Sequence, residues 1–399
     1  MLRRRDFMKW LLIFSAALHL CVSPLFAADK PFIPDPAKFA PMAKARHLSG
    51  ELVYMDAVNR RGGIRIDGGE SGRYWAGPIH YFALLPYATI WQNGARAALR
   101  DLPLGTHMHG WFFLPPKGEE DTIPPIPDSL GYKKLIVPEN HALMLADDFT
   151  HYANHGQIWK VKGVEIDKEK IHLEPAGKLV EQGIKTPYTF DLLATTRVWQ
   201  DRRWVELKDI KPGTTVRFNL GWAQGGHYNT VREFTITELW LDEASWKAST
   251  GRQRKKHVRF QRQRWTPGWI EKMEIFDFGG GRLTIKLFEV NREIIEDLSR
   301  ERNDRIAVAC AEKTLRTWFH RGDRKFCKLE KWAEIKNPVT GSSGVQITLR
   351  FKELLKGYSP GACVRVKADS WKFVSMPPEE RIHSIEEQKH GQKMVLPIY

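Results

Sequence analysis

The chain has 399 residues, a formal net charge of +15 at pH 7, 42% hydrophobic residues and only four cysteines. This length and composition exclude a disulfide scaffold and predict two to four domains with real cores, at about 100–200 residues each. The basic balance favours contact with anionic partners, although net charge alone does not choose among them.

The first 28 residues have the layout of an export signal. A basic start through Lys9 precedes a mostly apolar run over 10–26, and two alanines follow, which is typical of a secretory signal peptide. Residues 4–9 (Arg-Arg-Asp-Phe-Met-Lys) resemble the twin-arginine signal, which directs folded proteins to export. The apolar run is short for a stable membrane span, so cleavage would leave no transmembrane segment, and an uncleaved anchor is the alternative. Loss of four basic residues and one acid leaves a charge of +12.

Cleavage also removes Cys21 and leaves Cys310, Cys327 and Cys363. An odd number of cysteines in an oxidising compartment predicts at most one internal disulfide and a remaining thiol. The sequence leaves the pairing open.

After an extended leader over 29–46, a first β unit is predicted over 47–137. Alternating apolar residues favour strands at 50–58, 64–66 and 81–91, because one face of such a strand is buried. A proline-rich loop over 115–127 cannot lie inside a sheet.

This unit contains a stretch, 90–110, that recurs 108 residues later. Asp101 is predicted to accept backbone hydrogen bonds in a turn there, and Gly105 to take a positive φ. Because both acids recur, we interpret Asp101 and Asp209 as structural caps rather than catalytic groups, and the repeated tryptophans as core residues. The matching pairs are Trp91/Trp199, Gln92/Gln200, Leu99/Leu207, Asp101/Asp209, Gly105/Gly213 and Thr106/Thr214.

The rest of the chain repeats this plan. A helical connector is predicted over 138–155, with its helix at 141–155, followed by a second β unit over 156–240. A basic helical connector over 241–265 leads to a third, diverged β unit over 266–378, in which Trp318 takes the place of Trp91. A polar tail over 379–399 ends the chain.

Several short strands per unit favour small closed barrels, because closure removes unpaired sheet edges. The pattern Leu-x-Asp-Ile-x-x-Gly-x-x-Val resembles the turn into a strand of OB-like barrels, such as S1-type domains and short secreted β-barrel repeats of unknown function. The resemblance implies a mainly β protein of three tandem small OB-like β-barrel units joined by short α-helices.

His107 and His109 form the clearest candidate metal pair. Residues i and i+2 on a strand point to one face, as a zinc or copper site needs. The intervening Met108 is apolar in all three copies, so the histidines are predicted on the opposite, polar face. Solvent-facing polar residues or a polar groove are the alternative. Third ligands could come from His80, His141, His151 or His155.

A basic segment over 252–264 contains seven lysines and arginines and no carboxylate. Cationic rows beside Phe260, Trp265 and Trp269 could bind phosphates or sulfates and stack on sugars or bases. The alternative is a connector whose charges are offset by acids nearby in the fold. The candidate polyanion-binding residues are Arg252, Arg254, Lys255, Lys256, Arg259, Arg262 and Arg264.

No nucleophile elbow, phosphate-binding loop, His-Glu-x-x-His helix, Cys-x-x-Cys pair or dinucleotide fingerprint is present, so no cofactor is predicted. The sequence favours an exported, non-enzymatic binding or scaffolding protein of the cell envelope that engages anionic polysaccharide or envelope phosphate groups. An envelope hydrolase or metal-assisted enzyme with a groove near His107 and His109 is the second interpretation. A nucleic-acid-binding OB-like protein is the third, against which the export signal argues. The oligomeric state is open.

Overall fold

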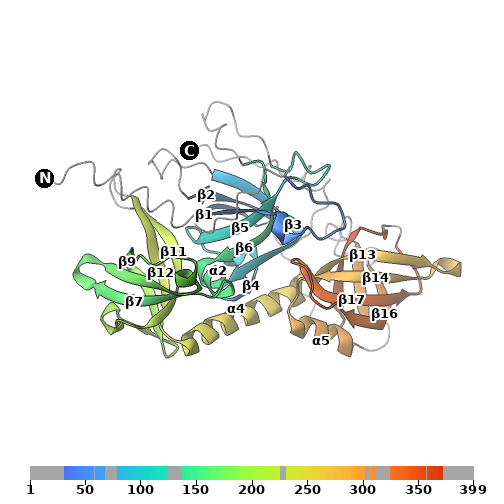
Figure 1. Cartoon of the computed structure of the whole chain (residues 1–399). Coiled ribbons are helices and arrows are strands. Elements are labelled where there is room, and N and C mark those ends of the chain that lie inside the picture. The colour runs from blue at the N-terminus through green and yellow to red at the C-terminus, as the bar shows by residue number, and fades with distance from the viewer. Residues whose placement is uncertain are drawn as a thin grey trace.

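A computed structural model describes residues 31–57, 59–67, 79–123, 137–224, 231–301, 305–310, 324–355 and 357–371. The predicted export signal, Trp318 and the polar tail lie outside these residues. The fold is mainly β, with three small closed barrels joined by helices, which confirms the predicted class. Barrel 1 lies between barrel 2, in green and yellow, and barrel 3, in orange and red (Figure 1).

Barrel 1 closes through one parallel strand pair. The strand order is β2-β1-β5-β6-β3-β4, and β2 also pairs with β3. Only β3 and β6 run parallel, while the other pairs are antiparallel. Leu52, Ile64, Phe82 and Leu145 fill the barrel and are fully buried. The strands are β1 (Arg46–Asp56), β2 (Arg61–Ile66), β3 (Ile79–Gln92), β4 (Ala95–Ala97), β5 (His107–Phe113) and β6 (His141–Asp147).

Barrel 2 repeats this topology strand for strand. The order is β10-β9-β12-β11-β7-β8, β9 also pairs with β8, and β9 and β12 form the parallel pair. Two short helices, η6 (Ile166–Lys168) and α3 (Lys178–Glu181), flank β8. The strands are β7 (Gln157–Glu165), β8 (Lys170–Gly177), β9 (Tyr188–Gln200), β10 (Arg203–Val205), β11 (Thr215–Gln224) and β12 (Val231–Trp240).

Barrel 3 closes with a different set of strands. Its order is β13-β14-β17-β16-β15-β18, and all pairs are antiparallel. An inserted hairpin, β15 with β16, fills the place that β6 has in barrel 1, which explains why the third copy diverges in sequence. The strands are β13 (Thr266–Ile275), β14 (Gly281–Phe288), β15 (Ile306–Cys310), β16 (Arg324–Glu334), β17 (Ser342–Phe351) and β18 (Cys363–Ala368).

The repeated motif forms the same turn in all three barrels. In each, the amide of a positive-φ glycine donates to a carbonyl of the first strand, at a point where that strand is irregular. This hydrogen bond holds the turn against the first strand of its barrel. Glycine adopts the left-handed conformation without the steric penalty that a Cβ brings. The three bonds join Gly105 to Leu52 at 2.8 Å, Gly213 to Val161 at 2.7 Å and Gly361 to Ile270 at 2.7 Å.

The predicted role of the repeated aspartates is also confirmed. Asp101 Oδ2 accepts from the Ala98 amide at 2.9 Å, and Asp209 Oδ2 accepts from the Glu206 amide at the same distance. Each carboxylate thus closes a one-turn 3-10 helix, η3 (Leu99–Asp101) or η7 (Leu207–Asp209). Both acids are structural.

The prediction that Trp91 and Trp199 are core residues is wrong. Both are only half-buried, because their neighbours Ile90 and Val198 face the core instead. An arginine lies over each ring: the Arg96 guanidinium is 3.5 Å from the Trp91 centroid, and Arg252 is 5.0 Å from that of Trp199.

The helix predicted over 141–155 is only half correct. Residues 141–147 form β6, which is buried almost throughout, and only Asp148–Asn154 form a helix, α2. An apolar run between two partner strands fits a buried strand as well as a helix, so periodicity does not separate them. Asp147 ends the strand and caps the helix, since its Oδ1 accepts from the Thr150 amide at 3.0 Å.

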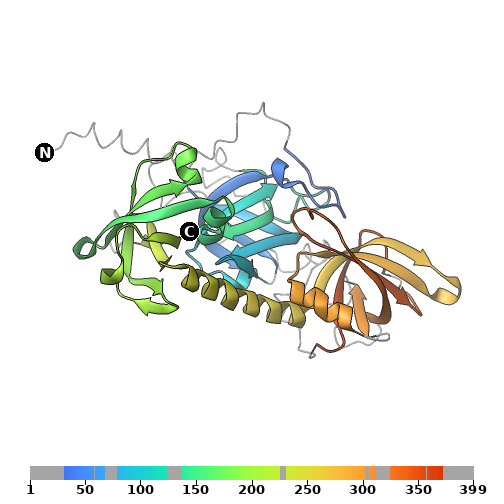
Figure 2. The ribbon, with the colours of Figure 1, turned by 60° about the horizontal axis from the view of Figure 1, so that its bottom comes forward.

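A long helix, α4 (Glu243–Arg264), connects barrels 2 and 3 and runs beneath barrel 1 (Figure 2). It packs against β4 and against α5 (Arg292–Arg300). The leader also joins barrels, because Phe39 contacts Tyr87 of barrel 1 and Trp269 of barrel 3 at centroid distances of 5.2 and 4.3 Å. Among the described residues, no helix combines the length and apolar character needed to cross a membrane.

Candidate metal centre

His107 and His109 lie on the face of strand β5 that is turned away from the core of barrel 1. Met108 is fully buried in that core, so the two histidines share the opposite face, as predicted. They do not face solvent, however: His107 is 0% and His109 4% exposed. Helix α2 and strand β11 of barrel 2 cover this face, and a β-bridge between Thr106 and Gly221 joins the two barrels beside it.

His107 is held by a carboxylate at each ring nitrogen. Its Nδ1 lies 2.8 Å from Asp148 Oδ1 and its Nε2 lies 2.9 Å from Asp67 Oδ2. Burial acts to lower the pKa of His107, but Asp148 and Asp67 outweigh burial and raise the pKa well above its usual value. A doubly protonated ring donates from both nitrogens and has no lone pair for a metal. The geometry therefore makes His107 an ionic anchor between the carboxylates.

Asp148 connects this anchor to His109 and to barrel 2. The same Oδ1 lies 3.1 Å from His109 Nε2, and Oδ2 accepts from the Leu220 amide of β11 at 2.9 Å. Burial favours a raised pKa for Asp148, but His107 and His109 reverse this effect and lower the pKa. Because Asp148 occupies Nε2, only Nδ1 of His109 can face a ligand.

Asp147 has a separate, structural role. In addition to capping α2, its Oδ2 accepts from the Asn93 amide at 2.7 Å and from Asn219 Nδ2 at 3.0 Å. Asn219 belongs to barrel 2, so this carboxylate also links the two barrels. The adjacent acids 147–148 carry no catalytic spacing in the sequence, and tertiary structure alone assigns them these functions.

Three imidazoles from three different elements converge beside the anchor. His47 of β1, His109 of β5 and His151 of α2 each offer a nitrogen, and these three atoms lie within 4.8 Å of one another. The His109 and His151 rings stack at a centroid distance of 3.6 Å and an interplanar angle of 5°. The His47 ring centroid lies 5.6 Å from that of His109 and 5.8 Å from that of His151, and His47 is exposed. We call these three residues the histidine triad.

Two buried nitrogens of the triad lack a hydrogen-bond partner among the described residues: Nδ1 of His109 and Nδ1 of His151. Leaving such groups unsatisfied costs about 1–3 kcal/mol each, so their persistence calls for an explanation. A metal ion between them would satisfy both lone pairs. Since an ion must lie in the plane of each ring that binds it, the parallel rings of His109 and His151 have to rotate toward each other.

The surroundings of the triad favour neutral imidazoles. Desolvation, together with the neighbouring histidines, lowers the pKa of His151 and lowers that of His47 to about 3. Desolvation lowers the pKa of His109 too, although Asp148 opposes it. Neutral imidazole is the form that binds metals, and a carboxylate on the second ring nitrogen is the usual partner of a metal-binding histidine. The residues therefore fit a transition-metal ion.

The sequence identified this site only in part. His109 and His151 were candidates and are in the triad, whereas His47 was not recognised, because only the pairing of β1 with β5 brings it near. His155 also lies close, with its ring 4.4 Å from that of His151. His80 packs on Phe112 instead, and His141 Nδ1 contacts Asn140 Oδ1 at 2.8 Å.

The basic segment 252–264 lies on α4, and acids offset much of its charge. Phe260, Trp265 and Trp269 are buried, so they offer no exposed stacking surface. Lys255 and Arg259 are exposed, whereas the side chain of Arg264 lies outside the described part. The ion pairs are Arg254 with Glu293 at 2.9 Å, Lys256 with Asp101 at 2.6 Å and Arg262 with Asp297 at 2.8 Å.

Neither of the two cysteines whose side chains the structure describes, Cys327 and Cys363, belongs to this site. Cys327 is buried and donates to the Ile306 carbonyl at 3.2 Å, and Cys363 lies in β18. These two thiols are not joined in a disulfide. The side chain of Cys310 lies outside the described residues.

No known protein family and no curated protein sequence matches this chain. Solved structures of CusF from Escherichia coli resemble one barrel-sized part. A Cu(II) form of a CusF variant and an Ag(I) form are each 17% identical over 22% of this chain and 90% of CusF, with TM-scores of 0.15. The apo form shows the same identity and TM-score and is covered over 86% of its length. At such TM-scores the likeness says nothing about the ligand of this chain.

Proposed function

We propose that this protein is an exported, non-enzymatic binding protein that holds one divalent transition-metal ion between barrels 1 and 2. The observation that carries the proposal is the pair of buried, unsatisfied nitrogens on His109 and His151, in a group of three histidines whose ligand atoms lie within 4.8 Å of one another. Imidazole ligands suit zinc, copper and nickel and are poor ligands for magnesium or calcium. His107, His109 and Asp148 form a second group whose ligand atoms lie within 4.8 Å of one another. We place the ion at the histidine triad instead, because both nitrogens of His107 already contact carboxylates.

Metal titration of the chelator-treated protein tests the proposal. We expect one Zn²⁺, Cu²⁺ or Ni²⁺ per chain by calorimetry and elemental analysis, and no binding of Mg²⁺. His109→Ala and His151→Ala should each abolish stoichiometric binding. Asp148→Asn should weaken it about 10–100-fold, as loss of an outer hydrogen bond to a ligand does.

His172→Ala is the matched control. This partly exposed histidine of barrel 2 contacts Glu165 and Thr189 and belongs to neither group that could hold a metal, so its variant removes an imidazole without changing the triad. Its variant should bind metal like the unaltered protein. A stoichiometric ion that survives in His109→Ala, or no ion at all at micromolar metal, would reject the proposal.

A metal-dependent hydrolase is the second candidate. Three protein ligands leave a fourth position for water in catalytic zinc sites, and His47, one of the three possible ligands, is exposed to solvent. Zinc-dependent cleavage of an activated ester or phosphate ester, lost in His151→Ala, would favour the enzyme over the binding protein. Equal rates with and without zinc would exclude it.

Polyanion binding through α4 is a separate proposal. Its support is the exposed side of the helix, where Arg252, Lys255 and Arg259 lie. Replacing these three residues and Arg254 with serine should weaken retention on a sulfated matrix and flatten its salt dependence. Unchanged elution would reject this part, and the metal titration would be unaffected.

Export rests on the first 28 residues. A reporter fused after this segment should leave the cytoplasm, and replacing Arg4 and Arg5 with lysine should stop it if the twin-arginine route is used. A reporter retained in the cytoplasm would contradict export.

A further inference from the structure

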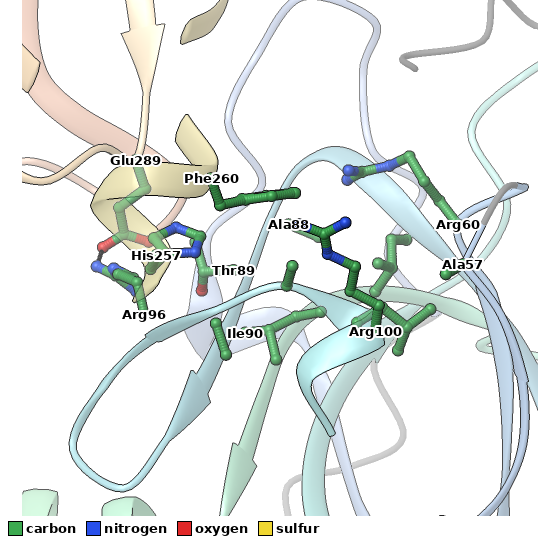
Figure 3. A pocket seen from close by; sticks show the side chains of 14 residues that line it. Ala57, Arg60, Ala88, Thr89, Ile90, Arg96, Arg100, His257, Phe260 and Glu289 are labelled. Atoms are coloured by element: carbon green, nitrogen blue, oxygen red, sulfur yellow. Dashed lines mark ion pairs between the residues drawn. The ribbon is translucent and has the colours of Figure 1, made fainter. Parts of the chain in front are cut away.

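The hairpin β3–β4 of barrel 1 and the hairpin β9–β10 of barrel 2 occupy equivalent positions in the repeat but have different surroundings. In barrel 1, Trp91 pairs with Arg96 across the two strands. Helix α4 packs against β4, and the Arg96 side chain, which forms an ion pair with Glu289 beyond β14, is only 14% exposed. Figure 3 shows Arg96 beside Glu289 and His257 of α4. This part of barrel 1 is therefore covered by other elements of the same chain.

The equivalent part of barrel 2 is more exposed. Trp199 and Trp204 stand where barrel 1 has Trp91 and Arg96, and they pair across β9 and β10 in the same way. Trp204 is 67% exposed. An indole has a large apolar surface, so leaving it in water forgoes more hydrophobic stabilisation than leaving an arginine there. An exposed indole at a position that barrel 1 covers is typical of a surface that binds a partner.

Contacts within barrel 2 hold both indoles in place. Trp199 Nε1 donates to Glu238 Oε1 at 2.7 Å, and Arg197 Nη2 donates to Oε2 of the same carboxylate at 3.2 Å. The Trp204 ring packs against the Trp199 ring with centroids 5.6 Å apart and an interplanar angle of 68°. Rings that are already fixed lose little conformational entropy when a ligand binds. Glu238 also attracts Arg252 of α4, so two arginines share this one carboxylate.

A row of cations on α4 continues from these rings. The guanidinium of Arg252 lies 5.0 Å from the Trp199 ring centroid. Lys255 and Arg259 follow at i+3 and i+7, so they lie along the same side of the helix, and all three cations are exposed. Among the described residues, none of the three forms an ion pair, whereas other cations of this helix do. The row is therefore able to contact an anionic ligand that also reaches Trp204.

We propose that this surface binds an acidic polysaccharide. The apolar C–H face of a sugar ring would stack on Trp204, while carboxylates or sulfates of the polymer lie along the cations of α4. The site rests on the polyanion binding proposed above for α4, to which Trp204 adds a preference for sugar rings. The predicted export signal favours polysaccharide over nucleic acid, whose bases also stack on aromatic rings. We call the site the tryptophan platform, and it consists of Trp199, Trp204, Arg252, Lys255 and Arg259.

Calorimetric titration of the full chain with defined polymers tests the proposal. Dextran sulfate offers sugar rings and charge, inorganic polyphosphate offers charge without rings, and dextran offers rings without charge. At equal concentrations of negative charge, dextran sulfate should bind about tenfold more tightly than polyphosphate, because only its rings stack on Trp204. Dextran should bind at least about tenfold more weakly than dextran sulfate, because it makes no ionic contact with α4.

Matched variants separate stacking from charge. Trp204→Ala should weaken binding of dextran sulfate about tenfold and change binding of polyphosphate by less than about twofold, whereas Trp204→Phe should keep most of the affinity for dextran sulfate. Trp332→Ala removes another exposed indole, in β16 of barrel 3, and should change neither affinity. Replacing Arg252, Lys255 and Arg259 together with serine should weaken binding of both polymers, because both need the cations. Since Trp204 is exposed, its variants should fold normally.

Three results would overturn the tryptophan platform. An equal loss for dextran sulfate and polyphosphate in Trp204→Ala, or no loss for either, would remove the stacking site and leave polyanion binding by α4 intact. Failure of both polymers to bind the unaltered chain would reject polyanion binding and the platform together. Tighter binding of oligo(dT) than of dextran sulfate, lost in Trp204→Ala, would identify single-stranded nucleic acid as the ligand in place of a polysaccharide.

Discussion

Barrels 1 and 2 have the same topology but different residues on one strand. Where β5 has His107 and His109, the equivalent positions of β11 have Thr215 and Arg217. In barrel 1 that face forms the anchor and the histidine triad. In barrel 2 Arg217 instead lies over Trp246 and Phe149, at 4.3 and 4.9 Å from the ring centroids. The scaffold is therefore shared, and the candidate chemistry depends on a few substitutions.

The shared part extends to the helix after each barrel. Asp147 accepts from the Asn93 amide at 2.7 Å, and Asp242 accepts from the Asp201 amide at 2.8 Å. Each aspartate also caps its own helix, α2 or α4. The cap thus holds the turn between two strands of its barrel. Helix position is conserved between the two units, while the residues that the helix covers differ.

The largest expected loss of stability comes from replacing His107 of barrel 1 with threonine, the residue at the equivalent position of barrel 2. His107→Thr leaves Asp67 and Asp148 buried without their cation, which should lower the free energy of unfolding by about 3–5 kcal/mol. Urea denaturation of chelator-treated protein measures it. Thr215→Ser, at the equivalent position, should change it by less than about 0.5 kcal/mol. Similar losses for the two variants would show that the anchor contributes no special stability.

Loss of a helix cap should also lower the free energy of unfolding more in barrel 1 than in barrel 2. Asp147→Ala removes the buried acceptor of the Thr150 amide, the Asn93 amide and one Asn219 Nδ2 hydrogen bond, so we expect a loss of about 2–3 kcal/mol. Asp242→Ala, at a more exposed cap, should cost about 1 kcal/mol. Thermal unfolding compares them. A larger loss for Asp242 would mean that barrel 2, rather than barrel 1, depends on its cap.

The contribution of His107, Asp67 and Asp148 to the free energy of unfolding should depend on pH. Asp67 and Asp148 have lowered pKa values, so their contribution is present above about pH 4 and is lost as pH falls through the folded-state pKa. His107 has a raised pKa, so its contribution is present below about pH 6.5 and declines as pH rises through the raised value. Without metal, this cluster should contribute most between about pH 4 and 6.5. His107→Gln should remove the decline on the alkaline side, and an unchanged profile would contradict the assignment.

The smallest difference in unfolding free energy between equivalent variants of the two barrels is expected at the repeated turn. Asp101→Ala should cost about 1–2 kcal/mol, because Asp101 also forms an ion pair with Lys256 at 2.6 Å and is almost fully buried. Asp209→Ala breaks the same turn bond at an exposed position and should cost about 0.5–1 kcal/mol. Equal values in chemical denaturation would show that the contact with α4 adds nothing.

Local sequence patterns were sufficient for the scaffold. The capping aspartate and the alternating strands act through neighbours within a few residues, so a repeat makes them visible. The turn glycine is visible through its local positive φ, although its hydrogen bond reaches a distant strand. Trp91 and Trp199 were misassigned because a repeat shows that a position matters but not which side of the strand it occupies. The helix predicted over 141–155 was too long because a buried strand and a buried helix share an apolar composition.

The sequence by itself determined three tandem small barrels, the turn that closes each of them, and the common face of His107 and His109. Only the tertiary structure decided which histidines meet. His47, His109 and His151 come from β1, β5 and α2, while His107 is contacted by Asp148 of α2 and by Asp67, which follows β2. Strand pairing and helix docking act between residues far apart in the chain, whereas hydrophobic periodicity reports only on which face of its own element a residue lies.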